Sequence, residues 1–246
     1  MFDIKKIISK ILNLFGYEIQ KNPSISSNVK EPFYHFRRIF FNIKSPIIFD
    51  IGAYVGDTVA LFKTSFSNSS IHAFEPFNES FIYLQNRFNK TDNVYLNNIA
   101  IGLNKNSKQM MFITKSKGSS SLLEPEKNAN ELWNGDPLRI QNKIEVESTT
   151  IDYYCQKNNI KEIHILKIDV QGSEFEVLKG AEQMLSQKKI KLIFTEVSIA
   201  PNYLGQTDLD VLIKFLKTYN YKIFNFFKMR HKDGRLIECD ILFTRT

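Results

Sequence analysis

Short apolar runs alternate with amphipathic stretches through the middle of the chain. The β-branched, strongly apolar runs predict strands at 46–52, 70–76, 93–102, 163–170 and 190–199. Apolar residues at helical spacing predict helices between them, at 55–66, 77–88 and 173–187. Because the strands are too apolar for an exposed sheet and alternate with helices, we expect a parallel sheet covered on both faces.

The last forty residues have a different pattern. A helix is predicted at 207–220, where Thr207 and Asp210 resemble a capping box. Two apolar runs, 221–229 and 236–244, then flank a turn that contains Asp233-Gly234, which predicts a β-hairpin. An antiparallel hairpin that closes a parallel sheet distinguishes this chain from an ordinary dinucleotide-binding fold.

The first 44 residues form a predicted helical extension to a domain at 45–246. Within residues 1–20, apolar side chains follow one helical face, namely Ile4, Ile7, Ile8, Ile11, Leu12 and Phe15. Two interpretations are open: a helix on a membrane surface, or a helix packed on the domain or on a second copy in a homodimer. Residues 20–32 have the composition of a linker, and 31–43 predict a short helix with aromatic anchors.

Charge and composition narrow the function classes. The 246 residues are 43% hydrophobic, which is enough for a large core. Of the net charge of +7, the first 44 residues carry +5, from eight basic and three acidic residues, so only +2 remains for the domain. This distribution argues against a nucleic-acid partner. Cys155 and Cys239 have no partner spacing, which favours a reducing compartment and a cytoplasmic protein, or one peripheral to the inner face of the membrane.

Candidate chemistry begins with the stretch FDIGAYVGD at 49–57. Asp50 ends the first predicted strand, and Gly52 to Gly56 form the turn into a helix. We expect Gly52 to let a ligand approach the backbone and Gly56 to let the helix start tightly. The acids Asp50 and Asp57 beside the turn disfavour a diphosphate and suit a ligand with an ammonium or sulfonium group.

A second acid, Glu75, ends the next predicted strand, 25 residues after Asp50. From this position a carboxylate accepts hydrogen bonds from both hydroxyls of a ribose. The alternative is that both acids cap helices, although two acids at successive strand ends exceed what capping needs. The two motifs together predict an adenosine site.

Five segments resemble the FkbM-type methyltransferases: DIGAYVGD, HAFEP, NIAIG, LKIDVQGSEFEVLKGA and ECDILFTR. The resemblance covers roughly residues 46–246. It implies an α/β, class I methyltransferase (Rossmann-like) fold, a seven-stranded, mostly parallel sheet with a C-terminal antiparallel hairpin. It also implies S-adenosylmethionine as cofactor and O-methylation, commonly of sugar or polyketide hydroxyls. Gln171 departs from the family, where a glutamate is frequent, so a base at that position is not carried over.

Together, the motifs and the resemblance imply a set of cofactor-binding residues: Asp50, Gly52, Ala53, Gly56, Asp57, Thr58, Glu75, Pro76, Asn98, Asp169 and Gln171. Ser119, Ser120 and Ser121 are further cofactor contacts that the resemblance suggests.

A sugar hydroxyl needs a general base, or a cation that lowers its pKa, before it attacks a methyl group. Asp169, at the end of a predicted strand, is the first candidate for the base, and Glu174 and Glu196 are the others. The three acids could supply a base, a metal site or both, while Glu174 could simply stabilise a helix N-terminus. Lys167, two residues before Asp169, could pair with it or orient it. Any metal would be a hard ion such as Mg²⁺, because no two histidines have ligand spacing.

Two polar segments are candidate walls for an acceptor. Residues 114–142 are too long for an ordinary loop and contain Trp133, which predicts a lid over a sugar, with a surface excursion as the alternative. Residues 201–206 could form the opposite wall. His72 and His164 lie in apolar strands and are expected in the core, whereas His231 is expected in solvent.

The sequence thus predicts an S-adenosylmethionine-dependent O-methyltransferase that acts on a sugar hydroxyl in surface glycan biosynthesis. Its partner would be a small-molecule or glycan acceptor, with peripheral membrane contact through residues 1–20 as a further expectation. The alternatives are a nucleotide-dependent oxidoreductase and a membrane- or nucleic-acid-binding module that acts through the basic N-terminus.

Overall fold

The computed structural model describes residues 31–245. The predicted amphipathic helix and most of the predicted linker lie outside this range. The described part of the predicted extension contains the expected short helix, α2 (Glu31–Ile39). Phe33, Phe36 and Phe40 from this region are buried in the core of the domain, where the Phe33 and Phe62 rings lie 5.0 Å apart.

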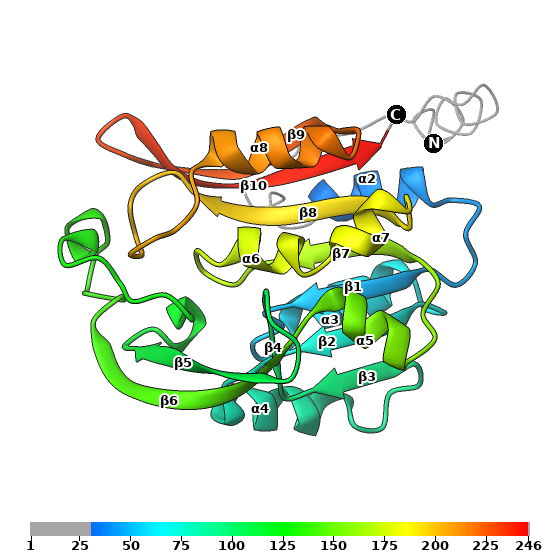
Figure 1. The fold of residues 1–246 in the computed structure, drawn as a ribbon, viewed down its shortest axis with the longest axis horizontal. Coiled ribbons are helices and arrows are strands. Elements are labelled where there is room, and N and C mark those ends of the chain that lie inside the picture. Colours follow the sequence, from blue (N-terminus) through cyan, green and yellow to red (C-terminus); the bar gives the residue numbers. More distant parts are fainter. Residues whose placement is uncertain (1–30, 246) are drawn as a thin grey trace, which may run out of the picture.

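A seven-stranded sheet runs through the centre of the molecule in the order β3-β2-β1-β7-β8-β10-β9 (Figure 1). All neighbours pair in parallel except β10, which is antiparallel to both β8 and β9. The predicted mostly parallel sheet and the C-terminal hairpin are therefore confirmed. The strands are β1 (Ile47–Ile51), β2 (Ser70–Phe74), β3 (Val94–Asn97), β7 (Ile163–Ile168), β8 (Ile190–Ser198), β9 (Tyr221–Lys232) and β10 (Arg235–Arg245).

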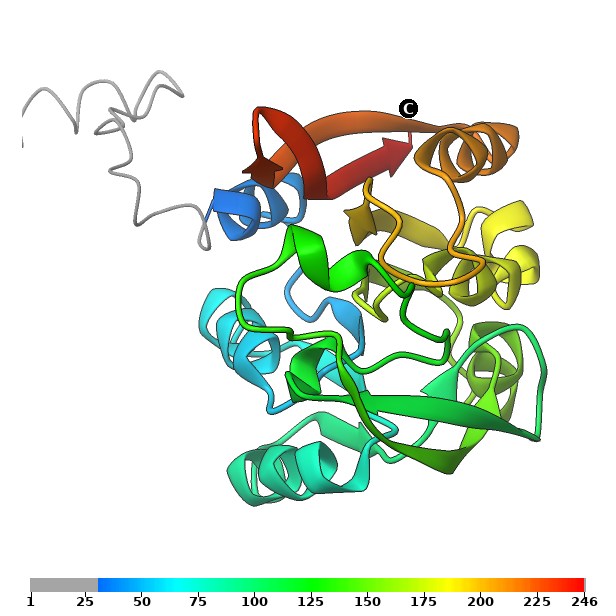
Figure 2. The ribbon, with the colours of Figure 1, turned by 90° about the vertical axis from the view of Figure 1, so that its left-hand side faces the viewer.

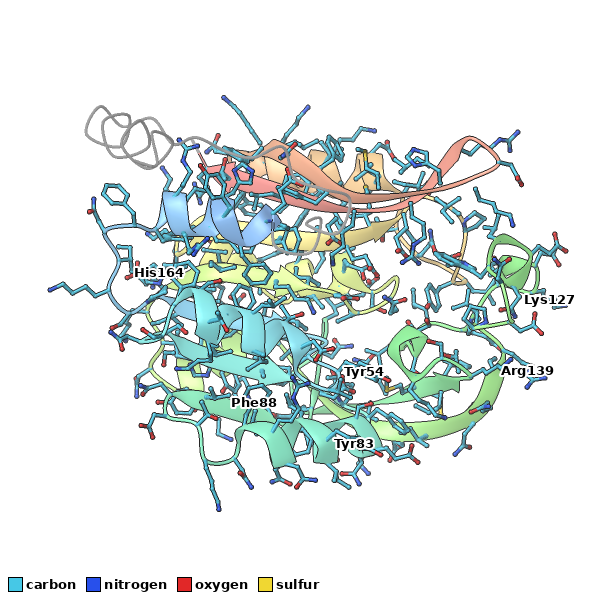
Figure 3. The ribbon with its side chains drawn as sticks, turned by 180° about the vertical axis from the view of Figure 1, so that it is seen from behind. Tyr54, Tyr83, Phe88, Lys127, Arg139 and His164 are labelled. Carbon is cyan, nitrogen blue, oxygen red and sulfur yellow. The ribbon has the colours of Figure 1, made fainter. Side chains whose placement is uncertain are left out.

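Helices cover both faces of the sheet, as the apolar strands require. On one face, together with α2, lie α3 (Asp57–Ser65) and α4 (Asn78–Phe88), in front in Figure 3. On the other face lie α5 (Ile151–Lys157), α6 (Glu174–Lys179), α7 (Glu182–Ser186) and α8 (Leu209–Thr218), in front in Figure 1. None of the helices within 31–245 combines the length and the apolar character needed to cross a bilayer.

A second, three-stranded sheet was not predicted. It has the order β4-β6-β5 and consists of β4 (Ala100–Ile101), β5 (Ser107–Thr114) and β6 (Ile140–Thr149). The single strand expected at 93–102 is divided, so that β3 belongs to the large sheet and β4 to the small one. Met111, Ile113 and Val146 bury one face of the small sheet.

Two predictions about helices are wrong in detail. The helix expected at 173–187 is interrupted between α6 and α7, where Asp152 accepts hydrogen bonds from the backbone N–H groups of Gln183 and Met184. Those two amides are in the first turn of α7, so a side chain from α5 caps a new helix start. The capping box expected at Thr207 is absent, because α8 has Asp208 at its N-cap with no side-chain cap bond.

Candidate active site

The carboxyl ends of β1, β2, β7 and β8 open into a cavity of about 390 Å³, here called the main cavity. Figure 2 looks onto these strand ends and shows residues 115–139, in green, in front of them. Residues 116–122 of that segment line the main cavity together with Trp133, Pro137 and Leu138. The segment also contains the short 3-10 helices η2 (Lys117–Ser119) and η3 (Ala129–Leu132). The long polar segment thus covers the strand ends, where the predicted lid would lie.

Glu75 lines the main cavity directly after β2, as predicted. Its Oε2 accepts a hydrogen bond from the Tyr54 N–H (2.9 Å) and its Oε1 one from the Phe77 N–H (2.8 Å). Burial raises the pKa of Glu75 to about 7, although these two amides favour the charged form. Since each carboxylate oxygen can accept a second bond, Glu75 is held in place with acceptor capacity left over.

Pro76 also lines the main cavity, but Asn98 does not. The Asn98 side-chain amide donates to the carbonyl oxygens of Glu75 (2.8 Å) and Pro76 (3.1 Å). Asn98 thus fixes the backbone that carries Glu75, and its direct contact with the cofactor stays a prediction.

The two glycines of the opening turn are needed for reasons that the sequence did not reveal. Gly52 has φ +77°, and a Cβ there would overlap the carbonyl oxygen of Asp169 on the neighbouring strand end. Gly56 has φ +90°, and a Cβ there would overlap Phe88 of α4. Gly52 lines the main cavity. However, the neighbour that leaves no room for a side chain there is the backbone of Asp169, not a ligand. The N–H groups of Gly52 and Ala53 both donate to the Phe74 carbonyl, and Ala53 is buried away from the cavity.

Asp50 and Lys167 form a buried ion pair beneath the turn, with 2.9 Å between Asp50 Oδ1 and Lys167 Nζ. Asp50 is 0% exposed, so the structure contradicts direct ligand contact by Asp50. Lys167 Nζ also donates to the Gly52 carbonyl oxygen (2.9 Å) and lies 3.6 Å from Asp169 Oδ2. Burial alone would lower the pKa of Lys167, but the two carboxylates raise it above its ordinary value. Lys167 is thus a permanent cation that positions the turn and Asp169.

Asp169 and Glu196 both line the main cavity, and the side chain of Gln171 connects them. Gln171 Nε2 donates to Asp169 Oδ1 (2.9 Å) and to Glu196 Oε2. Burial opposes a charge on Asp169, but Lys167, the Gln171 amide and Lys228 outweigh it and hold the pKa of Asp169 below its ordinary value. Burial and the neighbouring charge of Asp169 raise the pKa of Glu196 well above normal. The two neighbouring carboxyls therefore differ in proton affinity.

Glu174 does not reach the main cavity, contrary to its predicted catalytic role. Its Oε1 accepts hydrogen bonds from the N–H groups of Val170 (3.2 Å) and Gly172 (3.1 Å). These bonds hold the turn that presents Gln171, whose φ is +59°. Burial raises the pKa of Glu174 to about 7.

Asp57 and Thr58 line a second cavity of about 200 Å³ rather than the main one. Asp169 and Glu196 line both cavities, and Lys167 and Lys228 line only the second. Asp57 is paired with Arg87 across 2.7 Å. The two adjoining cavities share the carboxyl pair, and four predicted cofactor residues line neither of them: Asp50, Ala53, Gly56 and Asn98.

Residues 201–206 were expected to form the wall opposite the polar segment, but they lie against it: Pro125 forms a β-bridge with Tyr203, and the Trp133 indole donates to Asn202. Asn202 and Tyr203 line the main cavity, and the Tyr203 hydroxyl donates to the Ser119 carbonyl oxygen (2.8 Å) and contacts Gln171 Oε1 (3.1 Å). Ser121 Oγ donates to the Gln171 carbonyl oxygen (2.6 Å). The covering segment is therefore bonded directly to the residues around the carboxyl pair.

Among the side chains of the main cavity that sequence reasoning missed are the polar residues Tyr54, Arg230 and Glu238. Tyr54 lies inside the glycine-rich turn and has φ +48°; Figure 3 shows it on the side of the strand ends that faces residues 115–139. The Tyr54 ring lies against Gly118 of the covering segment: a Cβ added to that glycine would be 3.8 Å from the ring. Arg230 and Glu238 are paired across the β9–β10 hairpin, and a sequence pattern does not show that the hairpin reaches the cavity.

The remaining polar candidates have structural partners. His72 and His164 are nearly buried; His72 Nδ1 lies 2.9 Å from the Tyr154 hydroxyl, and the Ile47 N–H donates to His164 Nδ1 (3.0 Å). His231 is exposed. No three His, Cys, Asp or Glu side chains in the described part of the chain are arranged to hold a metal ion, so Mg²⁺ gains no support.

Comparison with known proteins agrees with this geometry. The family model of the methyltransferase FkbM domain matches residues 50–223. The 2-O-methyltransferase NoeI of Sinorhizobium fredii is 25% identical over 209 residues, which cover 82% of this chain and 80% of NoeI. Methyltransferase 1 of Beauveria bassiana is 25% identical over 145 residues, which cover 55% of this chain and 58% of that protein.

Solved structures support the same fold at low sequence identity. An rRNA methylase from Streptococcus thermophilus superposes with a TM-score of 0.50 at 8% identity and covers 91% of this chain and 99% of its own. The METTL16 methyltransferase domain gives 0.50 at 12% identity, with 99% and 79% covered. The chain therefore belongs to the FkbM family of methyltransferases and is an S-adenosylmethionine-dependent enzyme with the class I fold.

Proposed function

We propose that this methyltransferase transfers the methyl group to a hydroxyl of a sugar, in the biosynthesis of a surface glycan. The observation that carries the proposal is that Glu75 and the Asp169–Glu196 pair line one cavity. Glu75 is suited to bind the hydroxyls of a ribose, and the Asp169–Glu196 pair is suited to accept the proton of an acceptor hydroxyl. The name of NoeI, a 2-O-methyltransferase, supports an oxygen acceptor.

The residues of the main cavity fit S-adenosylmethionine. Glu75 keeps acceptor capacity for the two ribose hydroxyls, and Phe74, Ile99 and Met111 provide apolar walls for an adenine ring. Asp57 and Thr58 would hold the amino-acid end, since their cavity adjoins the main one at Asp169. When bound, S-adenosylmethionine supplies a methyl group on a positively charged sulfur, which the ionised Asp169 carboxylate stabilises electrostatically.

Asp169 and Glu196 have different roles in the transfer of the hydroxyl proton. In its ionised form, Glu196 is the stronger base of the two because its pKa is raised, and this form takes the proton from the acceptor hydroxyl. Asp169 stays ionised beside Lys167, orients Gln171 and raises the proton affinity of Glu196. This assignment moves the base from Asp169, the first candidate from sequence, to Glu196.

The test is formation of S-adenosylhomocysteine with a panel of free and nucleotide-linked sugars. Glu196→Gln is expected to lower kcat about 100-fold or more and to leave cofactor affinity unchanged. Asp169→Asn is expected to shift the pH profile of kcat toward lower pH, because it removes a negative charge that raises the pKa of Glu196.

Three results would contradict the proposal. Normal turnover by Glu196→Gln would remove Glu196 as the base. Loss of turnover in Asp169→Asn without a shift of the pH profile would return that role to Asp169. Failure of every hydroxyl acceptor, with transfer to an amine or thiol instead, would refute O-methylation.

Family membership does not support the nucleotide-dependent oxidoreductase that the sequence left open, and calorimetry with NAD(H) should show no binding. The alternative of a binding module that acts through residues 1–44 predicts that deletion of residues 1–30 abolishes function. We expect cofactor affinity to survive that deletion, because α2 and the cavity walls lie within residues 31–245.

We infer a cytoplasmic location from the chemistry of the cysteines. Cys155 and Cys239 are both buried and free, and burial raises the pKa of Cys239 to about 11, which suits a compartment that keeps thiols reduced. Residues 1–20 would contact the membrane surface or a second copy of the chain. Cell fractionation of the full chain and of a chain lacking residues 1–20 distinguishes these interpretations.

A further inference from the structure

The main cavity has a second charged end, far from Glu75. Three strands (β1, β7 and β8) separate β2, which Glu75 directly follows, from the hairpin strand β10. At this end the cavity is lined by Trp133 from the covering segment, Asn202 from the loop after β8, and Arg230 and Glu238 from the hairpin. Figure 1 shows the far end of the hairpin extending beyond the sheet, on the same side as the covering segment.

Arg230 is held in place at this end by two neighbours. Its guanidinium carbon lies 5.0 Å from the centre of the Trp133 ring, within the range of a cation–π contact. Trp133 is itself fixed, because its indole N–H donates to Asn202 Oδ1 (3.0 Å). The aromatic side chain that the sequence suggested as a surface for a sugar ring is therefore a platform for an arginine.

The charge of Arg230 is only weakly neutralised. Its Nη1 lies 3.4 Å from Glu238 Oε1, a single long contact rather than a bidentate pair. Arg230 makes no other ion pair among residues 31–245. The Arg230 side chain is 58% exposed, so most of its N–H donors remain available.

The other cations near the strand ends are already committed. Lys228 lies 2.9 Å from Asp240, and Lys167 is paired with Asp50. Lys117 lines the main cavity too, but it lies above the Phe77 ring, next to Glu75, and donates to Gln141 (2.9 Å). Arg230 is thus the cation placed to meet a ligand at the end of the cavity opposite the adenosine site.

We propose that Arg230, with Trp133 and Glu238 as its positioning residues, binds a negatively charged group on the acceptor, so that the substrate is an acidic or phosphorylated sugar. The proposal rests on the proposed function. A planar guanidinium with free donors binds carboxylate or phosphate in a bidentate manner. An anion bound there would lie across the cavity from Glu75, leaving the Asp169–Glu196 pair between the two ends of the substrate-binding space.

The first test uses inorganic phosphate as the probe. Phosphate is titrated by calorimetry into the full chain saturated with S-adenosylhomocysteine. Wild type is expected to bind phosphate, and Arg230→Gln is expected to bind it about tenfold more weakly or worse, through loss of a charged hydrogen bond. Arg235→Gln is the matched control, an exposed arginine on the same hairpin outside the cavity lining, and should bind as wild type does.

The second test distinguishes the two acids. Glucose, glucuronate and glucose 6-phosphate share a ring and differ in charge, and their binding is measured in the same way. Wild type is expected to prefer at least one acidic sugar over glucose, and Arg230→Gln should remove the preference. Whichever of glucuronate and glucose 6-phosphate binds more tightly identifies the group that Arg230 binds as a carboxylate or a phosphate.

Two outcomes overturn the inference: no binding of phosphate or of either acidic sugar to wild type, or equal binding to wild type and Arg230→Gln. Neither depends on methyl transfer, which S-adenosylhomocysteine formation tests separately. A chain that methylates neutral sugars normally and ignores anions would thus refute the Arg230 subsite and leave the proposed function intact.

Discussion

Replacing Glu174 with glutamine should make the protein more stable, and increasingly so as the pH rises. Both backbone bonds that Glu174 accepts, from Val170 and Gly172, go to the same atom, Oε1. A glutamine retains that oxygen and both bonds, and removes only the charge. The substitution therefore isolates the free energy of ionising one buried carboxyl.

The magnitude follows from the pKa of Glu174, which burial raises from 4.5 to about 7. A carboxyl with a raised pKa in the folded state contributes stability below its unfolded pKa and loses it as the pH rises through the folded value. At about 1.4 kcal/mol for each pH unit, the full difference is about 3 kcal/mol. Between about pH 5 and about pH 8, the stability of Glu174→Gln relative to wild type should increase by about 2.5 kcal/mol.

Urea unfolding at several pH values measures this difference. Glu79→Gln, an exposed glutamate of α4, is the matched control and should show no such trend with pH. Glu174→Ala loses both backbone bonds and should be destabilised at every pH, by about 2 kcal/mol or more. A relative stability of Glu174→Gln that does not change with pH would refute the reasoning, and a tenfold fall in kcat would restore a catalytic role.

Three further predictions concern the turn, the ribose site and the covering segment. Affinity for S-adenosylhomocysteine should rise about tenfold between about pH 6 and about pH 8 as Glu75 ionises, and Glu75→Gln should abolish the trend in calorimetry. Gly56→Ala should cost about 2 to 4 kcal/mol in urea unfolding, because its φ is +90° and its Cβ would overlap Phe88. Tyr203→Phe loses its bond to the Ser119 carbonyl and should cost about 1 kcal/mol; faster proteolysis within residues 115–139 would confirm the link, and unchanged cleavage would contradict it.

Much of the large sheet could be predicted because its signals are local. β-branched runs such as 46–52 and the turn at Asp233-Gly234 depend on nearby residues only, and β1, β9 and β10 appear where the pattern indicated. The interruption between α6 and α7 depends on Asp152, which lies 31 residues before Gln183 in the chain, and was missed for that reason. The small sheet was missed because β4 has two residues and gains its partner β6 only through tertiary pairing.

The residues of the candidate site were also only partly predictable from the sequence. Sequence placed Glu75, Asp169, Gln171 and Glu196 at strand ends, and all four line the main cavity. It could not distinguish them from Glu174, because a carboxylate directed at backbone amides and one directed at a cavity have the same spacing along the chain.

The sequence by itself determined the order of strands and helices, the glycine-rich turn and the acids at the strand ends, since each is a matter of residue type and short-range spacing. Only the tertiary structure decided which of those acids meet a cavity and what proton affinity each has. Burial raises the pKa of both Asp50 and Glu196, but Asp50 is enclosed beneath the turn against Lys167, whereas Glu196 reaches the cavity beside Asp169. The physical reason is that burial and charge are set by neighbours from distant strands, and Arg230 reaches the cavity only because the hairpin folds back beside β8.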